Sequence, residues 1–403
     1  MALLTSYATT NQDSDLKLRD AAARTSIAMG FQVAAACSPT LGVLYLKNVG
    51  TTGLGQFVAK IHDASRSVLA TSREVEAGVG GGNYIQSAVY TKVPFRFDSP
   101  PSLSPSTQYH LVLEGDFAID ASNHASWGSD ASSPGYTNGQ ASVYDGASWS
   151  NVSPAVDLCF ELWDCTLIDI PIVTGVYGID TYLDQAFPDA IWMTQPGMTL
   201  GKASGGKGAA TMCRPLLGFN LPDGGIAAGA TINSAYLWWH LSTNLGSMAA
   251  ELFYIFRCTR DFATEWAHDP ATGHYCSWNE RCAPHNWLWT TAGGDWDAAM
   301  YTNGTFVAAI GGVIQRRWQS FNLETLGLVQ DAVDNRNLRL NLLAKHFNEG
   351  LAQTGGDIPA YDTGLVTGMR PFIQVDYDNP AVAGRPQPYM VSRSDRPIHQ
   401  MGV

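Results

Sequence analysis

Residues 235–241 read AYLWWHL, a stretch in which two kinds of side chain alternate along the chain. Successive residues of a β-strand point to opposite faces of its sheet, so this pattern predicts a strand with one buried and one aromatic face. The buried face would carry Ala235, Leu237, Trp239 and Leu241, and the aromatic face Tyr236, Trp238 and His240. Residues 338–342 and 373–377 alternate in the same way. The core predicted from these strands contains Leu237, Trp239, Leu340, Leu342, Ile373 and Val375.

Short apolar segments separated by turn residues also fill the first half of the chain. The strongest alternation lies in residues 156–163, where Val156, Leu158, Phe160 and Leu162 share one face. The other expected strands cover residues 27–36, 40–47, 57–62, 90–97 and 109–114, and Gly78–Gly82 is expected to be a hairpin tip. One segment, residues 323–333 with Asn322 as N-cap, has a helical pattern. The sequence therefore predicts an all-β fold of two antiparallel, jelly-roll-like β-sandwiches.

The predicted domain organisation follows the changes in pattern along the chain. Residues 1–26 are expected to form an N-terminal arm, residues 27–167 the first sandwich and residues 168–175 a linker. The second sandwich is expected over residues 176–378. Residues 379–403, which contain four prolines and the cations Arg385, Arg393 and Arg396, are expected to be an extended assembly tail.

Charge and composition exclude several classes of partner. The 403 residues include 24 Lys and Arg against 36 Asp and Glu, which gives a net charge of −12. An acidic chain without a basic run has no electrostatic footprint for nucleic acid or anionic lipid. No apolar run approaches the roughly 20 residues of a membrane span, and no export signal is visible at the start.

Six segments, in order over residues 176–378, resemble landmarks of the DNRLRE domain, the β-sandwich of carbohydrate-binding module family 96. They are residues 180–183, 214–221, 228–237, 266 with 276–279, 321–323 with 328–330, and 370–377. Asn220 and Asn322 stand where the family usually has Asp, which weakens the case for a cation at those positions. Residues 41–50, 109–116 and 141–149 are similar to the jelly-roll domains of surface-anchored and phage proteins. Both resemblances imply β-sandwiches, and neither implies an enzyme.

No motif of a nucleophile elbow, a P-loop, a zinc hydrolase or an EF-hand is present, and we expect no catalytic site. We expect no cofactor, with a structural calcium ion as an alternative. Between residues 258 and 285, Cys276 and Cys282 are candidates for a disulfide. Zinc binding by the cysteines and histidines of this region, or reduced cysteines in a packed loop, are the alternatives.

Tryptophan is concentrated in residues 266–296. Flat aromatic side chains beside polar groups either stack on sugar rings or build a small core or a protein interface. The aromatic face of residues 236–240, expected to be exposed, has the same ambiguity. The candidate contacts for a glycan or a protein partner are Trp238, His240, Trp266, Trp278, Trp287 and Trp289.

These features lead to the expectation of a phage virion structural protein, assembled in the host cytoplasm and displayed on the particle surface. It would serve as a head decoration or as a tail or baseplate accessory, with a capacity to bind glycans. Its partners would be other virion proteins, copies of itself and a host surface glycan, without nucleic acid or membrane. The alternative is a secreted carbohydrate-binding protein.

Overall fold

The computed structural model of this chain is built of antiparallel β-sheets. Among the residues that it describes, one α-helix, Leu328–Asn335 (α2), and the short 3-10 helices Thr9–Asn11 (η1) and Leu221–Gly224 (η2) accompany the strands. The predicted all-β class is confirmed. The described residues are 2–50, 55–76, 78–79, 82–83, 90–170, 179–187, 189, 197–203, 211–241, 243–245, 251–259, 276–282, 287–306, 317–346, 355–359 and 369–380.

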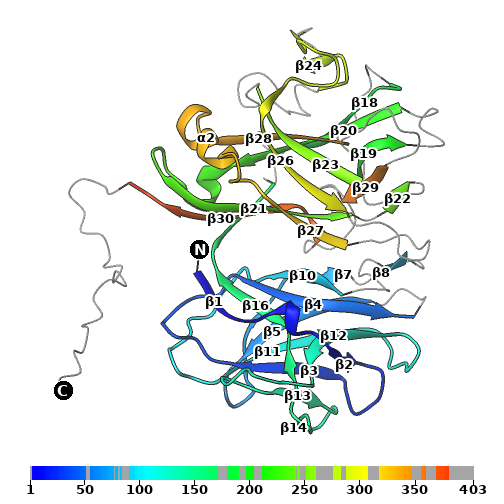
Figure 1. Cartoon of the computed structure of the whole chain (residues 1–403), viewed down its shortest axis with the longest axis vertical. Helices are drawn as coiled ribbons and strands as arrows, with labels where there is room; N and C mark the ends of the chain where they lie inside the picture. The colour runs from blue at the N-terminus through cyan, green and yellow to red at the C-terminus, as the bar shows by residue number, and fades with distance from the viewer. Residues whose placement is uncertain are drawn as a thin grey trace.

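The first sandwich consists of two seven-stranded sheets, named here sheet I and sheet II (Figure 1). Sheet I has the order β14-β13-β3-β11-β5-β6, with β7 beside β5. These strands are Trp149–Asn151, Ala141–Tyr144, Ser26–Phe31, Tyr109–Gly115, Gln56–His62, Val68–Thr71 and Val75–Glu76. Sheet II has the order β1-β16-β4-β12-β15, with β10 beside β4 and β2 beside β12. These strands are Ala2–Tyr7, Phe160–Asp164, Leu41–Val49, His124–Asp130, Asp157–Leu158, Thr91–Arg96 and Ser14–Leu18.

The second sandwich consists of sheets III and IV. Sheet III has the order β17-β30-β21-β27, formed by Thr166–Asp169, Phe372–Asp378, Thr231–Leu241 and Arg317–Asn322. Sheet IV has the order β22-β29-β19-β20-β28-β23-β26, with β18 beside β20. These strands are Thr243–Leu245, Gly355–Pro359, Gly197–Ala203, Thr211–Asn220, Arg339–His346, Glu251–Cys258, Trp296–Phe306 and Ile179–Asp184.

Two small hairpins complete the described strands. Gly78–Val79 (β8) pairs with Gly82–Asn83 (β9), so the expected hairpin at the glycine run is confirmed. Glu280–Cys282 (β24) pairs with Trp287–Leu288 (β25).

Each sandwich has an apolar core between its two sheets. The first core contains large buried rings, among them Phe31, Phe57, Phe95, Trp127 and Phe160. All six residues predicted for the second core are buried there, together with the inner face of α2. The period-two pattern of the sequence therefore identified the correct inner face of β21, β28 and β30.

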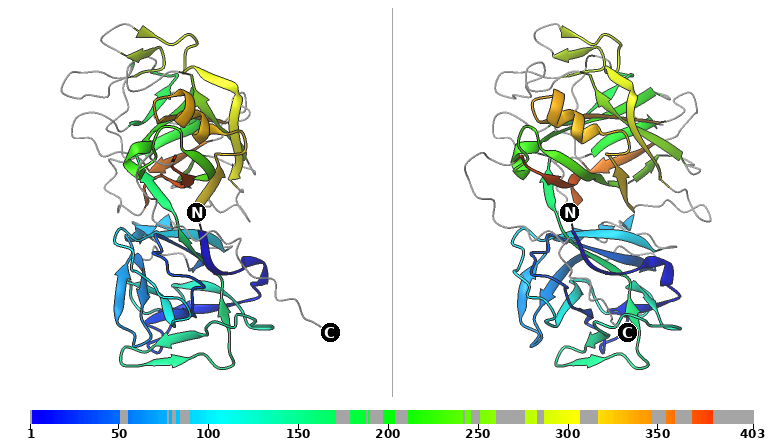
Figure 2. Two further views of the ribbon diagram at one scale, coloured as in Figure 1. Left: turned by 90° about the vertical axis from the view of Figure 1, so that its left-hand side faces the viewer. Right: turned by 60° about the vertical axis from the view of Figure 1, so that its left-hand side comes forward.

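The two sandwiches are packed against each other through sheets II and III, which gives four stacked layers in the order I, II, III and IV. The two halves lie one above the other in all three views (Figure 1, Figure 2). Trp238, Trp318, Met369 and Phe372, all from the second sandwich, belong to the same apolar cluster as the core of the first. The interface between the sandwiches is thus an apolar packing layer.

Three predicted boundaries are wrong. Residues 1–26 are not an arm, because β1 pairs with β16 and β2 pairs with β12 inside sheet II. The predicted linker starts inside β17, which pairs with β30 in sheet III. The helix begins after Gly327, and Asn322 instead caps the preceding turn, where its Oδ1 accepts the N–H of Glu324 at 2.9 Å. Residues 381–403, which include Arg385, Arg393 and Arg396, lie outside the described residues.

We expect Leu340→Ala to lower the free energy of unfolding by about 2–5 kcal/mol, because Leu340 is buried in the second core and truncation leaves a cavity. Leu326→Ala is the matched control, since the Leu326 side chain is 42% exposed and its loss should cost less than about 0.5 kcal/mol. Denaturant titration of both variants measures the difference. Equal effects would contradict the assigned face of β28.

Candidate functional site

A cleft of about 390 Å³ opens where sheet II meets sheet III. It falls within the size range of small-ligand pockets, which start at roughly 300 Å³. Both sandwiches and the N-terminal strand contribute to its walls. The lining residues are Leu3, Ser6, Ala8, Thr9, Lys92, Glu161, Trp163, Tyr236, Trp238, Ser320 and Gln374.

Sheet III supplies the aromatic wall of the cleft. Because Leu237 and Trp239 face the second core, strand alternation directs Tyr236 and Trp238 toward sheet II. The indole N–H of Trp238 donates to Oε1 of Gln374 at 2.8 Å, and its ring stacks on Phe372 with centroids 6.2 Å apart. The hydrogen bond and the stacking fix the orientation of the indole at the cleft.

Sheet II supplies the charged wall. Nζ of Lys92 on β10 forms an ion pair with Glu161 on β16. The other carboxylate oxygen of Glu161 accepts the indole N–H of Trp163 at 3.1 Å. This carboxylate is therefore placed between a cation and an aromatic donor at the rim of the cleft. Leu3 and Ser6 of β1 continue this wall, because β1 pairs with β16.

The cleft combines aromatic rings with hydroxyl, amide, carboxylate and ammonium groups. Such a lining suits a ligand with both an apolar face and several hydroxyl groups, since rings cover the face and polar groups bind the hydroxyls. Of this lining, Trp238 is a contact predicted from the sequence, whereas the walls formed by β1, β10 and β16 are not. The available signal was the pair Glu161 and Trp163, on the polar side of the alternation in residues 156–163.

A buried cation holds the two sandwiches together beside this cleft. Arg96 at the end of β10 is only 3% exposed and forms an ion pair with Asp169 of β17. Its guanidinium also lies 4.5 Å from the ring centroid of Phe372. Burial lowers the pKa of Arg96 to about 10, so the side chain remains charged at neutral pH. Arg73 bridges Asp169 to Asp98 and extends this cluster toward solvent.

The expectation that Trp238 and His240 form an exposed face is wrong. Trp238 is 5% exposed and His240 is fully buried, because this side of sheet III packs against the first sandwich. The His240 ring lies edge-on to Trp318, with centroids 5.4 Å apart. The sequence left two roles open for this face, stacking on a sugar ring or packing in a core or interface. The structure supports packing for His240 and places Trp238 at the edge of the cleft.

The tryptophan-rich segment also builds a small core. Trp278 and Trp289 are buried in one cluster with Leu183, Leu216, Cys258, Cys276 and Leu343. The guanidinium of Arg214 lies 4.8 Å from the ring centroids of both Trp278 and Trp296. Neither buried indole offers a flat open platform. Trp266 and the side chain of Trp287 lie outside the described residues.

The predicted disulfide between Cys276 and Cys282 is contradicted, since Cys276 is a buried thiol rather than half of a disulfide. It packs near Cys258, whose pKa is raised because burial disfavours the thiolate. Within the described part of the chain, no group of three or more His, Cys, Asp or Glu side chains is arranged to hold a metal ion. His268, His274 and His285 lie outside that part.

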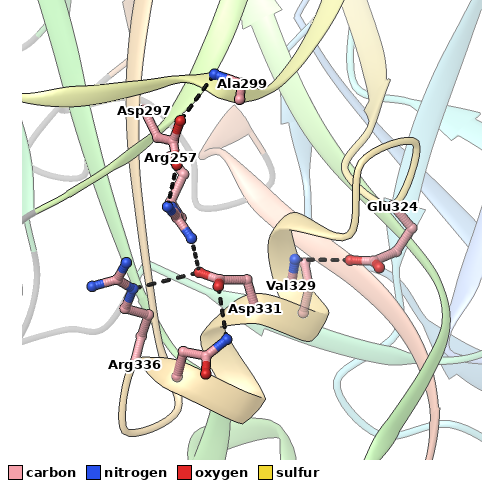
Figure 3. A network of polar contacts seen from close by, with 8 residues as sticks. Arg257, Asp297, Ala299, Glu324, Val329, Asp331 and Arg336 are labelled. Atoms are coloured by element: carbon pink, nitrogen blue, oxygen red, sulfur yellow. Dashed lines mark hydrogen bonds and ion pairs between the residues drawn. The ribbon is translucent and has the colours of Figure 1, made fainter.

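Figure 3 shows a charged network that anchors α2 to sheet IV. Arg257 of β23 forms ion pairs with Asp297 of β26 and, at 2.5 Å, with Asp331 of α2. Glu324 accepts the N–H of Val329 at 2.8 Å, and burial raises the pKa of Glu324 to about 7. Because the two aspartates are each paired with a cation, we assign this network a structural role.

No family model matches this sequence, and a search of curated proteins also finds no match. Among the described residues, no helix is long and apolar enough to cross a membrane.

We expect Asp169→Asn to destabilise the protein by about 3 kcal/mol, because the buried Arg96 loses its counter-ion. Asp98→Asn is the matched control. Its pair with Arg73 is at the surface, and exposed pairs contribute at most about 1 kcal/mol. Calorimetry of both variants tests the difference. If the Asp169→Asn variant had the same melting temperature as the Asp98→Asn control, the assigned role of Arg96 would be contradicted.

Proposed function

We propose that this chain is a structural protein of a bacteriophage particle, displayed on the particle surface as a head decoration or as a tail or baseplate accessory. The observation that carries this proposal is the docking of sheet II on sheet III. Trp238, Trp318 and Phe372 pack there in one cluster with the first core, so the two sandwiches form a stiff block. A stiff block suits an element of a particle better than a binding module on a flexible linker.

The resemblances of the two halves support the same proposal. The first half is similar to jelly-roll domains of surface-anchored and phage proteins, and the second resembles the DNRLRE domain, the β-sandwich of carbohydrate-binding module family 96. The net charge of −12 disfavours a role in contact with the packaged nucleic acid. The protein would act by assembly and contact, without catalysis, and its basic tail would meet acidic surfaces of neighbouring subunits.

Truncation after Asn379 tests the assembly role of the tail. The Asn379 side chain accepts the N–H of Ala227 and donates to the carbonyl of Gly225, both at 2.9 Å, so this cut preserves the end of the last strand. We expect a nearly unchanged melting temperature but a loss of incorporation when the variant is supplied during infection by phage lacking the gene. Quantitative mass spectrometry of purified particles measures the copy number.

The full-length variant with Arg385, Arg393 and Arg396 replaced by Gln separates charge from length. It should also incorporate poorly, because its tail lacks the cations expected to meet acidic neighbours. Normal occupancy of the truncated protein in particles would contradict the assembly role.

A second candidate function, carbohydrate binding, is favoured by the lining of the interdomain cleft. Trp163 and Tyr236 offer ring surface, while Ser320, Gln374 and the Lys92–Glu161 pair offer hydrogen-bonding groups. This function fits either a virion protein that contacts host glycans or a secreted carbohydrate-binding protein.

Filling the cleft tests this candidate. We expect Ser320→Trp to abolish glycan binding on an array of bacterial surface glycans, because the new indole would occupy the space between the two walls. Ser148→Trp places the same ring on an exposed turn of the first sandwich and should leave binding unchanged. Equal binding by both variants, or no binding by the unmodified protein, would contradict a glycan site in this cleft.

A further inference from the structure

The outer face of sheet I carries a cluster of nitrogen-bearing side chains far from the cleft. His62 of β5 and His110 of β11 are directly opposite each other across the two strands. Arg66, from the turn between β5 and β6, reaches over this face and donates from Nη2 to Oγ of Ser142 at 2.9 Å. Its guanidinium lies 4.4 Å from the ring centroid of Trp149, which also contacts the His62 ring edge-on.

Four nitrogen atoms of this cluster are buried without a hydrogen-bond partner among the described residues. They are Nδ1 and Nε2 of His62, Nδ1 of His110 and Nη1 of Arg66. The whole His62 residue is only 5% exposed. Buried polar groups are nearly always paired in native proteins, so such a concentration of unpaired nitrogens indicates a missing acceptor.

The nearby carboxylates do not supply that acceptor. Glu114, four residues further along β11 than His110 and on the same face, forms an ion pair with Lys60 at 2.6 Å. Oδ1 of Asp63 accepts two hydrogen bonds, from the hydroxyl of Ser65 at 2.7 Å and from the backbone N–H of Ser67 at 2.9 Å. Arg66 therefore faces two imidazoles without a hydrogen-bonded counter-ion.

We propose that Arg66, His62 and His110 form a binding site for a small oxyanion of the phosphate or sulfate class. Oxygen atoms of one compact anion would accept hydrogen bonds from Nη1 of Arg66 and from one ring N–H of each histidine. Hydrogen bonds between charged partners are the strong ones. Arg66 closes the site, held over it by one side-chain hydrogen bond to Ser142 and by stacking on Trp149.

Binding at this site should strengthen as the pH falls. Burial and the Arg66 charge lower the pKa of His110 to about 4, and burial also lowers the pKa of His62. Lys60 and Arg66 lower the pKa of His62 further, while Glu114 and Asp63 act in the opposite direction. A bound anion favours both imidazolium forms and raises both pKa values. Anion binding is then coupled to proton uptake, so affinity is higher at pH 6 than at pH 8.

Phosphate and sulfate titrations of the full chain test the site, with chloride at matched ionic strength as reference. We expect phosphate and sulfate to raise the melting temperature, more at pH 6 than at pH 8. In nitrogen-detected NMR, the His62 and His110 signals should shift toward the imidazolium form.

Arg66→Gln should weaken binding about tenfold or more, because a charge-assisted hydrogen bond is lost. Lys47→Gln is the matched control. It removes a cation that lies over the Tyr90 ring at sheet II, and this variant should bind phosphate and sulfate normally.

Two results would overturn the assignment. Histidine signals that do not respond to either anion would mean that water alone fills the site. Equal weakening by Arg66→Gln and Lys47→Gln would mean that the anions act through general screening. This test does not depend on virion incorporation or glycan binding, so its outcome is separate from theirs.

Discussion

The arrangement of the two sandwiches depends on one buried cation. Arg96 extends from the sheet II strand β10 into a layer almost without access to water, where an unpaired charge would be very costly. Asp169 of β17 supplies the opposite charge and Phe372 of β30 supplies the face of an aromatic ring. Both partners belong to sheet III. Separating the sheets would therefore leave a desolvated guanidinium without its partners or require it to be rehydrated.

The covalent chain reinforces this contact. Strand β16 of sheet II ends at Asp164 and strand β17 of sheet III begins at Thr166, so Cys165 alone connects them. The Thr40 hydroxyl forms hydrogen bonds with both polar backbone groups of Cys165. It accepts the Cys165 N–H at 3.1 Å and donates to the Cys165 carbonyl at 2.7 Å. A crossing this short and well anchored leaves little freedom between the sandwiches. The cleft at their boundary consequently has walls that are held in position before any ligand arrives.

Strand alternation predicted the faces of this fold better than it predicted what the faces contact. The pattern at Leu237 and Trp239 correctly placed both residues in a core, because a period of two is a local property of a strand. The same pattern placed Trp238 and His240 on the opposite face, also correctly. Whether that face meets water, a ligand or another sheet depends on β10 and β16, more than 70 residues earlier in the sequence. No local pattern contains this information.

The N-terminal residues show how a long-range pairing can change the meaning of a neighbouring strand. Considered alone, residues 156–163 have a polar face, yet Asp157 and Cys159 on that face are buried. The start of the chain explains part of this burial, because the thiol of Cys159 donates to the carbonyl of Ala8 at 3.5 Å, next to the paired strands β1 and β16. The same start of the chain supplies Leu3, Ser6, Ala8 and Thr9 to the cleft. A segment interpreted from its sequence as a separate arm thus completes both one edge of sheet II and the candidate binding site, because strand pairing joins residues 2–7 to residues 160–164.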